Sequence, residues 1–107
     1  MIQIELHRKV YVLPSHIVPE ADFDYYIAAA KRYNFDTRSD DIFVFFDGEL
    51  TRIGLLSYDG TGYQWCVKRL SKGNIHWQAE EDKVSKISTS DLQIILKGGN
   101  PDIIETA

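Results

Sequence analysis

The pattern of apolar and polar residues divides the chain into short strands and two helices. β-Branched and aromatic residues at 9–13 predict a strand that stops at Pro14. The apolar run 42–46 has the length of a strand and predicts a central one. Two further strands, 52–58 and 63–70, follow after glycine-containing turns, and 75–77 is short enough to pair back as a fourth strand of this region.

Two segments carry helical periodicity. Pro19 is placed to open the first helix, where its missing N–H does no harm, and the pattern ends near Asn34. Its apolar stripe, at i, i+3, i+4 and i+7 spacing, consists of Phe23, Tyr26, Ile27 and Ala30. Ser88 and Asp91 form a capping-box pattern that predicts a second helix over 89–97, ended by Gly98-Gly99. The charged stretch 78–86 is expected to be a mobile loop, and Asn100 begins a short tail.

These elements predict an α+β fold in one domain, residues 1–107. Its centre is an antiparallel meander over 42–77, made by three successive hairpins. The sheet is expected to have about four to five strands and to pack with the two helices.

Composition adds a cellular setting. The content of hydrophobic residues, 44%, and of charged residues, 26%, is that of an ordinary folded protein. A single cysteine, Cys66, rules out an intrachain disulfide and fits a reducing compartment. The chain shows no apolar run typical of a signal peptide or of a membrane span, so we expect a cytoplasmic protein.

Positive charge is concentrated in one part of a chain whose net charge is −4. Residues 52–77 hold Arg52, Lys68, Arg69 and Lys72 against Asp59 alone, four positive charges minus one negative, or +3. This segment predicts a local basic surface. The alternative is a set of solvated charges at strand edges.

The strand 63–70 has two distinct faces. Tyr63, Trp65, Val67 and Arg69 alternate onto one face, and Gln64, Cys66 and Lys68 onto the other. Basic residues among aromatic ones on an open sheet can contact nucleic acid. For Tyr63, Trp65 and Trp77, burial under the helices is the competing interpretation, and we favour it for Tyr63 and Trp65 because aromatic residues of small domains are mostly buried.

No residue set predicts catalysis, a metal site or a cofactor. Cys66 has His76 as a potential partner across a hairpin, the minimum for a thiol nucleophile. A half-buried structural cysteine is favoured, because no third orienting group or glycine-rich oxyanion loop lies nearby in the sequence. The three histidines, His7, His16 and His76, are scattered along the sequence. The acidic residues that a two-metal nuclease would need each suit a turn or a helix cap; these are Asp47, Asp59 and Asp91.

The segment from Ile42 to Asn100 resembles a known family. The matching pattern is Ile42-Phe43-Val44-Phe45, Arg52-Ile53, Tyr58-Asp59-Gly60-x-Gly62, Lys68-Arg69-Leu70-x-x-Gly73-x-x-x-Trp77, and Leu92 with Leu96-x-Gly98. This order resembles the TnpB accessory protein of insertion-sequence family sixty-six, which is unrelated to the RNA-guided nuclease of the same name. Members of that family carry an acidic-Met-Arg-Lys-Gly motif between the first strand and first helix. Here residues 16–22 contain no basic pair.

The resemblance implies a bacterial, non-catalytic accessory protein of transposition and DNA recombination. Its implied partners are the transposase of the same element and, as a second partner, the DNA of the element. Arg52, Lys68, Arg69 and Lys72 match basic positions of the family pattern and are the candidate nucleic-acid contacts. The alternatives are a pure protein-interaction module and a domesticated transposon relic without DNA binding.

Overall fold

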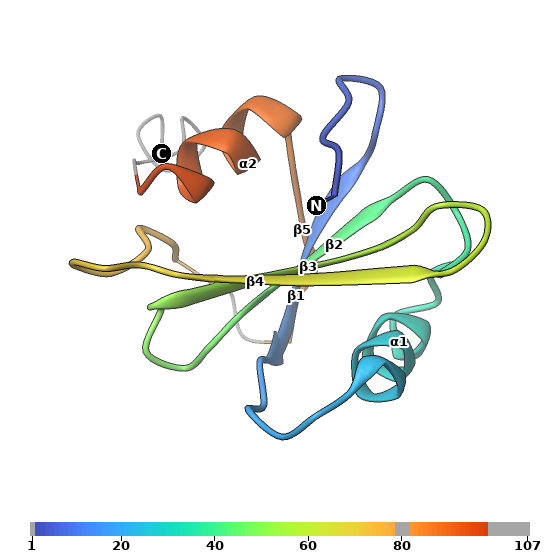
Figure 1. The fold of residues 1–107 in the computed structure, drawn as a ribbon, viewed down its shortest axis with the longest axis horizontal. Coiled ribbons are helices and arrows are strands. Elements are labelled where there is room, and N and C mark those ends of the chain that lie inside the picture. The colour runs from blue at the N-terminus through green and yellow to red at the C-terminus, as the bar shows by residue number, and fades with distance from the viewer. Residues whose placement is uncertain (1, 79–81, 99–107) are drawn as a thin grey trace.

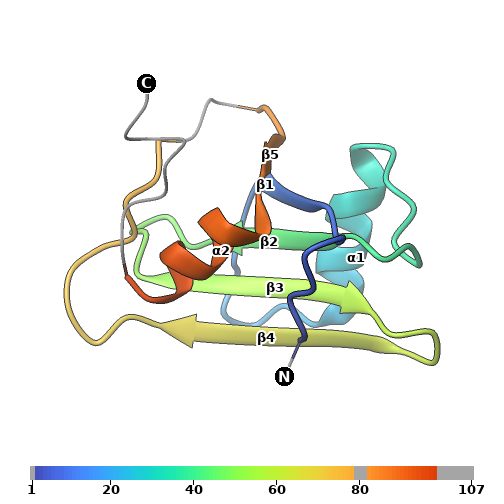
Figure 2. The same ribbon diagram turned by 90° about the horizontal axis from the view of Figure 1, so that it is seen from above.

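The computed structural model describes residues 2–78 and 82–98. A five-stranded sheet lies at the centre with one helix on each face (Figure 1). The strands run in the order β4-β3-β2-β1-β5, and Figure 2 shows β4 at one edge and β5 at the other. The α+β class predicted from the sequence is confirmed. The elements are β1 (Val10–His16), α1 (Phe23–Arg32), β2 (Ile42–Phe46), β3 (Arg52–Tyr58), β4 (Tyr63–Arg69), β5 (Ser85–Ile87) and α2 (Thr89–Leu96).

Strand β2 is the buried centre of the sheet, as its unbroken apolar run predicts. All five of its residues are buried. Phe43 and Phe45 pack on the α1 side, with Tyr26 and Ala30. The other three side chains pack on the α2 side, with Leu92 and Ile95 among their neighbours. A strand covered on both faces cannot alternate apolar with polar residues, which explains the continuous run.

Strand β1 corrects two expectations. It pairs parallel with β2, because α1 crosses over between them, so the sheet is mixed and not a simple meander. It also continues past Pro14 to His16, with a register shift between Val12 and His16. A proline lacks the N–H that a regular ladder requires, and such an irregularity accommodates it.

Helix α1 begins later than predicted. Residues 18–21 form a turn in which the Ala21 N–H donates to the Val18 carbonyl, so Pro19 lies outside the helix. Asp22 is the N-cap, and its side chain accepts from the Asp24 N–H. Phe23 stands in the first turn with 44% of its surface exposed, and its predicted place in the buried stripe is wrong. The buried face consists of Tyr26, Ala29 and Ala30.

The predicted fourth strand of the meander, 75–77, does not form. Only two hairpins, β2–β3 and β3–β4, are present in the described residues. Ile75 and Trp77 are instead both buried against the α2-side core, where the Trp77 ring lies 5.6 Å from that of Phe46. The further strand is β5, which pairs antiparallel with β1. It includes two residues, Ser85 and Lys86, of the stretch expected to be a mobile loop; residues 79–81 of that stretch lie outside the described residues.

Helix α2 follows the prediction closely. The Ser88 side chain accepts from the Asp91 N–H, and the helix spans Thr89–Leu96 with Lys97 as its C-cap. Gly98 has a φ of 81°, the left-handed conformation expected of a helix stop. Gly99 and the tail from Asn100 lie outside the described residues. None of the described helices is long and apolar enough to cross a membrane.

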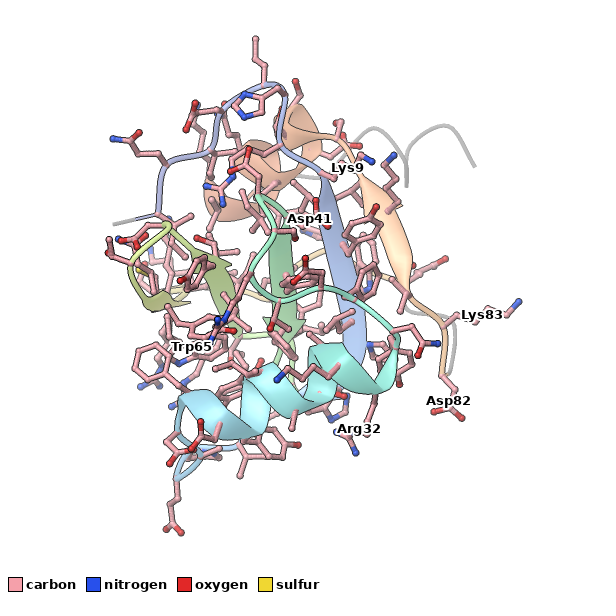
Figure 3. All side chains as sticks on the ribbon, turned by 90° about the vertical axis from the view of Figure 1, so that its right-hand side faces the viewer. Lys9, Arg32, Asp41, Trp65, Asp82 and Lys83 are labelled. Atoms are coloured by element: carbon pink, nitrogen blue, oxygen red, sulfur yellow. The ribbon has the colours of Figure 1, made fainter. Side chains whose placement is uncertain are left out.

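Trp65 packs on α1, as the favoured interpretation of the aromatic residues predicted. Trp65 is labelled in Figure 3, and its ring is stacked on that of Tyr26, with centroids 3.9 Å apart. Gly54 makes room for this contact, because a Cβ there would lie 2.3 Å from the Trp65 ring. Tyr63 lies on the same side, and its hydroxyl is 2.9 Å from that of Thr37. Trp65 thus joins β4 to the α1 layer.

Candidate nucleic-acid interface

Three of the four predicted basic residues meet at one end of the β3–β4 hairpin. Arg52 is the first residue of β3 and lies directly opposite Arg69, the last residue of β4. Lys72 follows in the turn after β4. These three residues, called here the basic end, line a shallow hollow of about 340 Å³. The hairpin register therefore brings together cations that are far apart in the sequence.

The hollow also contains two carboxylates, Asp47 and Glu49. The Asp47 carboxylate accepts hydrogen bonds from the Thr51 N–H (2.7 Å), the Thr51 hydroxyl (2.6 Å) and the Arg52 N–H (2.9 Å). Partial burial acts to raise the pKa of Asp47, but these hydrogen bonds and the positive charge of Arg52 outweigh burial and lower it. Asp47 thus holds the β2–β3 turn, as its turn position predicted.

The charged groups of the basic end form no ion pair within residues 2–78 and 82–98. The positive charge of Arg52 nevertheless acts on the neighbouring Asp47 carboxylate. Arg69 and Lys72 are exposed, and Arg52 is half-buried. An unpaired cation on a surface keeps its full capacity to contact a phosphate. The hollow thus gathers three cations and two carboxylates, three minus two, or a net charge of +1.

Lys68 lies apart from the other three. Its side chain belongs to the α2 face of β4, whereas Arg69 and Arg52 lie on the opposite face. The Lys68 ammonium donates to the carbonyl of Leu96 in the last turn of α2. A lysine at that position satisfies a free carbonyl and complements the helix dipole. The geometry gives Lys68 a structural contact that its place in the sequence pattern did not predict.

The segment in which the family motif carries its basic pair lies beside the basic end. Residues 17–21 connect β1 to α1 and share a hollow of about 270 Å³ with Arg52, Trp65 and Val67. The segment is fixed by Tyr26, whose hydroxyl accepts from the Val18 N–H and donates to the Val18 carbonyl, both at 3.0 Å. In this chain the segment lines the hollow with the apolar residues Ile17, Val18, Pro19 and Ala21, and it also carries the exposed Glu20.

Cys66 lies on the α2 face of β4 and is half-buried against the core. His76 is exposed and lies in no strand. The hairpin expected to place His76 across from Cys66 is therefore absent. Asp59 accepts from the Thr61 and Gly62 N–H groups, which lower its pKa and close the β3–β4 turn. Among the described residues, no three side chains of His, Cys, Asp or Glu come together to hold a metal ion.

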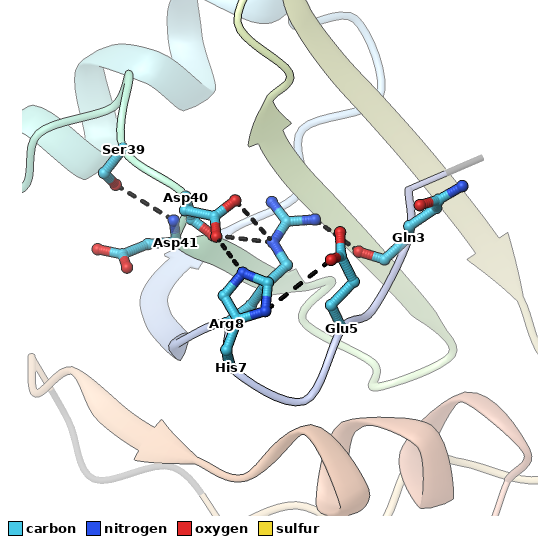
Figure 4. Close-up of polar contacts among 7 residues, drawn as sticks. All are labelled: Gln3, Glu5, His7, Arg8, Ser39, Asp40 and Asp41. Atoms are coloured by element: carbon cyan, nitrogen blue, oxygen red, sulfur yellow. Dashed lines mark hydrogen bonds and ion pairs between the residues drawn. The ribbon is translucent and has the colours of Figure 1, made fainter.

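A polar cluster at the other end of the sheet was not predicted. Arg8 is buried, and its Nε donates to the Asp40 carbonyl at 2.8 Å and lies 3.5 Å from the Asp40 carboxylate (Figure 4). His7 reaches the same carboxylate at 2.6 Å. Arg8 and Asp40 border a polar hollow of about 550 Å³ with Arg38, Tyr58 and Asp59. We call this set the polar end. The sequence signal was weak: Arg8 is one charge among many in the N-terminal half.

Fold and surface together define a small α+β module with three basic side chains gathered at one end of its sheet. A family model described as IS66 Orf2 like protein matches residues 8–105. The chain therefore belongs to this family, a family of accessory proteins associated with transposition, as the sequence resemblance indicated. The curated proteins and the solved structures gave no significant match.

Proposed function

We propose that this chain is a non-catalytic accessory protein of transposition that binds the DNA of its own element through the basic end. The observation that supports this most is the meeting of Arg52, Arg69 and Lys72 without ion-pair partners among the described residues. The transposase of the same element supplies the chemistry of strand transfer, and this chain contributes contacts to the DNA beside it.

The proposal predicts weak, salt-sensitive binding. Each phosphate contact to duplex DNA releases counterions, and the logarithm of the affinity falls with the logarithm of the salt concentration by about 0.9 per contact. Three contacts therefore predict a roughly fortyfold loss between about 50 and 200 mM salt. The net charge of −4 opposes binding elsewhere on the surface, so the DNA is expected to sit at one end of the sheet.

The test measures fluorescence anisotropy of a duplex carrying the terminal repeat of the element, over a salt series. R69A/K72A is expected to abolish the shift at moderate salt and to reduce the slope by about 1.8, as two lost contacts require. K31A/R32A on α1 removes the same charge from another exposed surface and is the matched control. Equal losses in both variants, or absence of binding at low salt, would reject the proposal.

A second candidate is a protein-interaction module that binds the transposase without DNA. An apolar hollow of about 540 Å³ on the α2 face favours it, with Ile53, Leu55, Cys66 and Leu96 in its walls. Apolar concave surfaces of this size commonly bind protein side chains. The test is binding of purified transposase to wild type and to R69A/K72A. Equal binding to both proteins, with no DNA affinity in either, would support this candidate over the first.

A further inference from the structure

The outer edge of β4 is unpaired in the described part of the chain, residues 2–78 and 82–98 (Figure 2). Two hydrogen bonds fix which groups face it: the Asp59 N–H donates to the Gly62 carbonyl, and the Leu70 N–H to the Thr51 carbonyl. Because inward and outward residues alternate along an antiparallel strand, the free N–H and carbonyl groups belong to odd-numbered residues. They are Tyr63, Trp65, Val67 and Arg69.

This edge has few of the features that usually protect an edge strand against pairing. Strand β4 is seven residues long and contains no proline, and its pairing with β3 is regular along the whole length. Val67, whose backbone faces outward, is 47% exposed. Proline, bulges and charged side chains, especially Lys, normally keep such an edge from pairing. Strand β4 carries only Lys68 and Arg69 of these, both at its C-terminal end. A long, regular edge with an exposed apolar side chain is therefore suited to receive another strand.

We propose that β4 pairs antiparallel with β4 of a second copy of this chain, about a two-fold axis at Cys66. Cys66 is the central residue of the strand, so this register uses all seven residues. The register also agrees with the hydrogen-bonding pattern, because the residues that it joins by backbone hydrogen bonds are those whose N–H and carbonyl groups face outward. Trp65 meets Val67 of the second copy, and Tyr63 meets Arg69 of the second copy, as hydrogen-bonded pairs. Cys66 meets its own copy as a non-hydrogen-bonded pair, in which Cα atoms lie about 4.5 Å apart.

The side-chain pairs in this register are complementary on both faces. On the α1 face, Trp65 lies opposite the exposed Val67 of the second copy, and Tyr63 lies opposite Arg69. On the α2 face, the Gln64 amide meets the Lys68 ammonium. No like charges face each other directly, whereas an axis at Lys68 would oppose two ammonium groups. The strand is thus complementary to itself in one register, which is what an isologous interface requires.

Sedimentation of the full chain over a concentration series tests the pairing. Wild type is expected to dissociate reversibly from dimer to monomer. V67K should weaken the dimer at least about tenfold, because both symmetric pairs exchange an exposed apolar side chain at the edge for Lys, the residue that typically protects an edge strand from pairing. L6K introduces the same charge at a side chain that is 86% exposed and lies outside the strands, and it should leave the dimer unchanged. A wild-type chain that stays monomeric at all concentrations overturns the proposal.

Position 64 provides a second pair of variants that keeps the test independent of V67K folding. Q64E places a carboxylate opposite Lys68 of the second copy and should tighten the dimer. Q64K places like charges there and should weaken it. With two such pairs by symmetry, a shift of roughly two- to thirtyfold in each direction follows from typical cross-strand pair energies. Identical dissociation constants for the two variants would exclude this register.

Amide exchange and thiol cross-linking locate the interface. In the dimer the outward amides of Trp65 and Val67 should be as protected as the inward amides of Cys66 and Lys68. Diamide should oxidise the two Cys66 thiols to one intersubunit disulfide, with C66S as the control. Fast exchange of the outward amides overturns the proposal, as does protection of these amides in a monomer, which would mean that part of the same chain covers the edge. Neither measurement depends on DNA, so failure here leaves the proposed function untouched.

Discussion

The two ends of the central sheet use positive charge in opposite ways. At the polar end, the Arg8 side chain is only 6% exposed and contacts a carboxylate and two main-chain carbonyls. At the basic end, Arg52, Arg69 and Lys72 share a surface hollow and form no ion pair with any described residue. A count of charges along the sequence cannot separate these uses. What separates them is whether the charged nitrogen already has acceptors within the fold.

The largest expected effect is a loss of stability when the cation of the polar end is removed, compared with the removal of one cation from the basic end. R8M should lower the free energy of unfolding by about 3 kcal/mol, because two partly buried hydrogen bonds to main-chain carbonyls lose their charged donor. R69M should change it by less than about 0.5 kcal/mol, as is usual for an exposed side chain without partners. Urea denaturation followed by circular dichroism measures both. If the two variants lost equal stability, the distinction between the ends would fail.

A substitution halfway between the ends separates stability from binding. G54A should destabilise the fold by about 2 kcal/mol, since the new Cβ forces the Trp65 ring off Tyr26. The charged groups of the basic end are left in place, so DNA affinity of the folded protein is expected to stay near that of wild type. Thermal melting and anisotropy at low temperature give the two readouts. A loss of affinity as large as that of R69A/K72A would show that binding follows general stability.

The pH dependence of the basic end follows from Asp47. Its pKa lies below the ordinary value of 3.8 in the folded state, so the carboxylate contributes stability above that value and loses it as pH falls through the folded pKa. D47N should therefore be less stable than wild type by about 1 kcal/mol at neutral pH. The difference should shrink as pH falls below about 4. A difference that stays constant down to pH of about 2 would mean that the charge of Asp47 contributes nothing.

The elements that the sequence predicts correctly are those specified by local signals. The central strand, the β3–β4 hairpin and α2 with its Ser88 cap were predicted, because apolar runs, turn residues and caps are local signals. The parallel pairing of β1 was missed, because it depends on where α1 returns the chain. Strand β5 is three residues long and carries no apolar pattern, so only its contact with β1 defines it.

The candidate site was predicted in part for a related reason. Arg52 and Arg69 meet because the hairpin register places them opposite each other, and that register follows from the turn at Asp59. Lys68 is adjacent to Arg69 in sequence but faces α2, as strand alternation requires. Arg8 and Asp40 are separated by 32 positions, and no local pattern connects them. The contacts that could not be predicted from the sequence are those between polar groups far apart along the chain.

The smallest predicted effect concerns the missing basic pair of the family. Val18 is exposed and belongs to the segment that shares a hollow with Arg52. V18R should add one phosphate contact to the basic end and raise DNA affinity roughly three- to eightfold at about 0.1 M salt, with a salt slope steeper by about 0.9. V18Q is the uncharged control. The backbone of Val18 is held by the Tyr26 hydroxyl whatever its side chain, so the fold should tolerate both substitutions. If V18R left the slope unchanged, the DNA would not cross this segment, and the contact surface would end at Arg52.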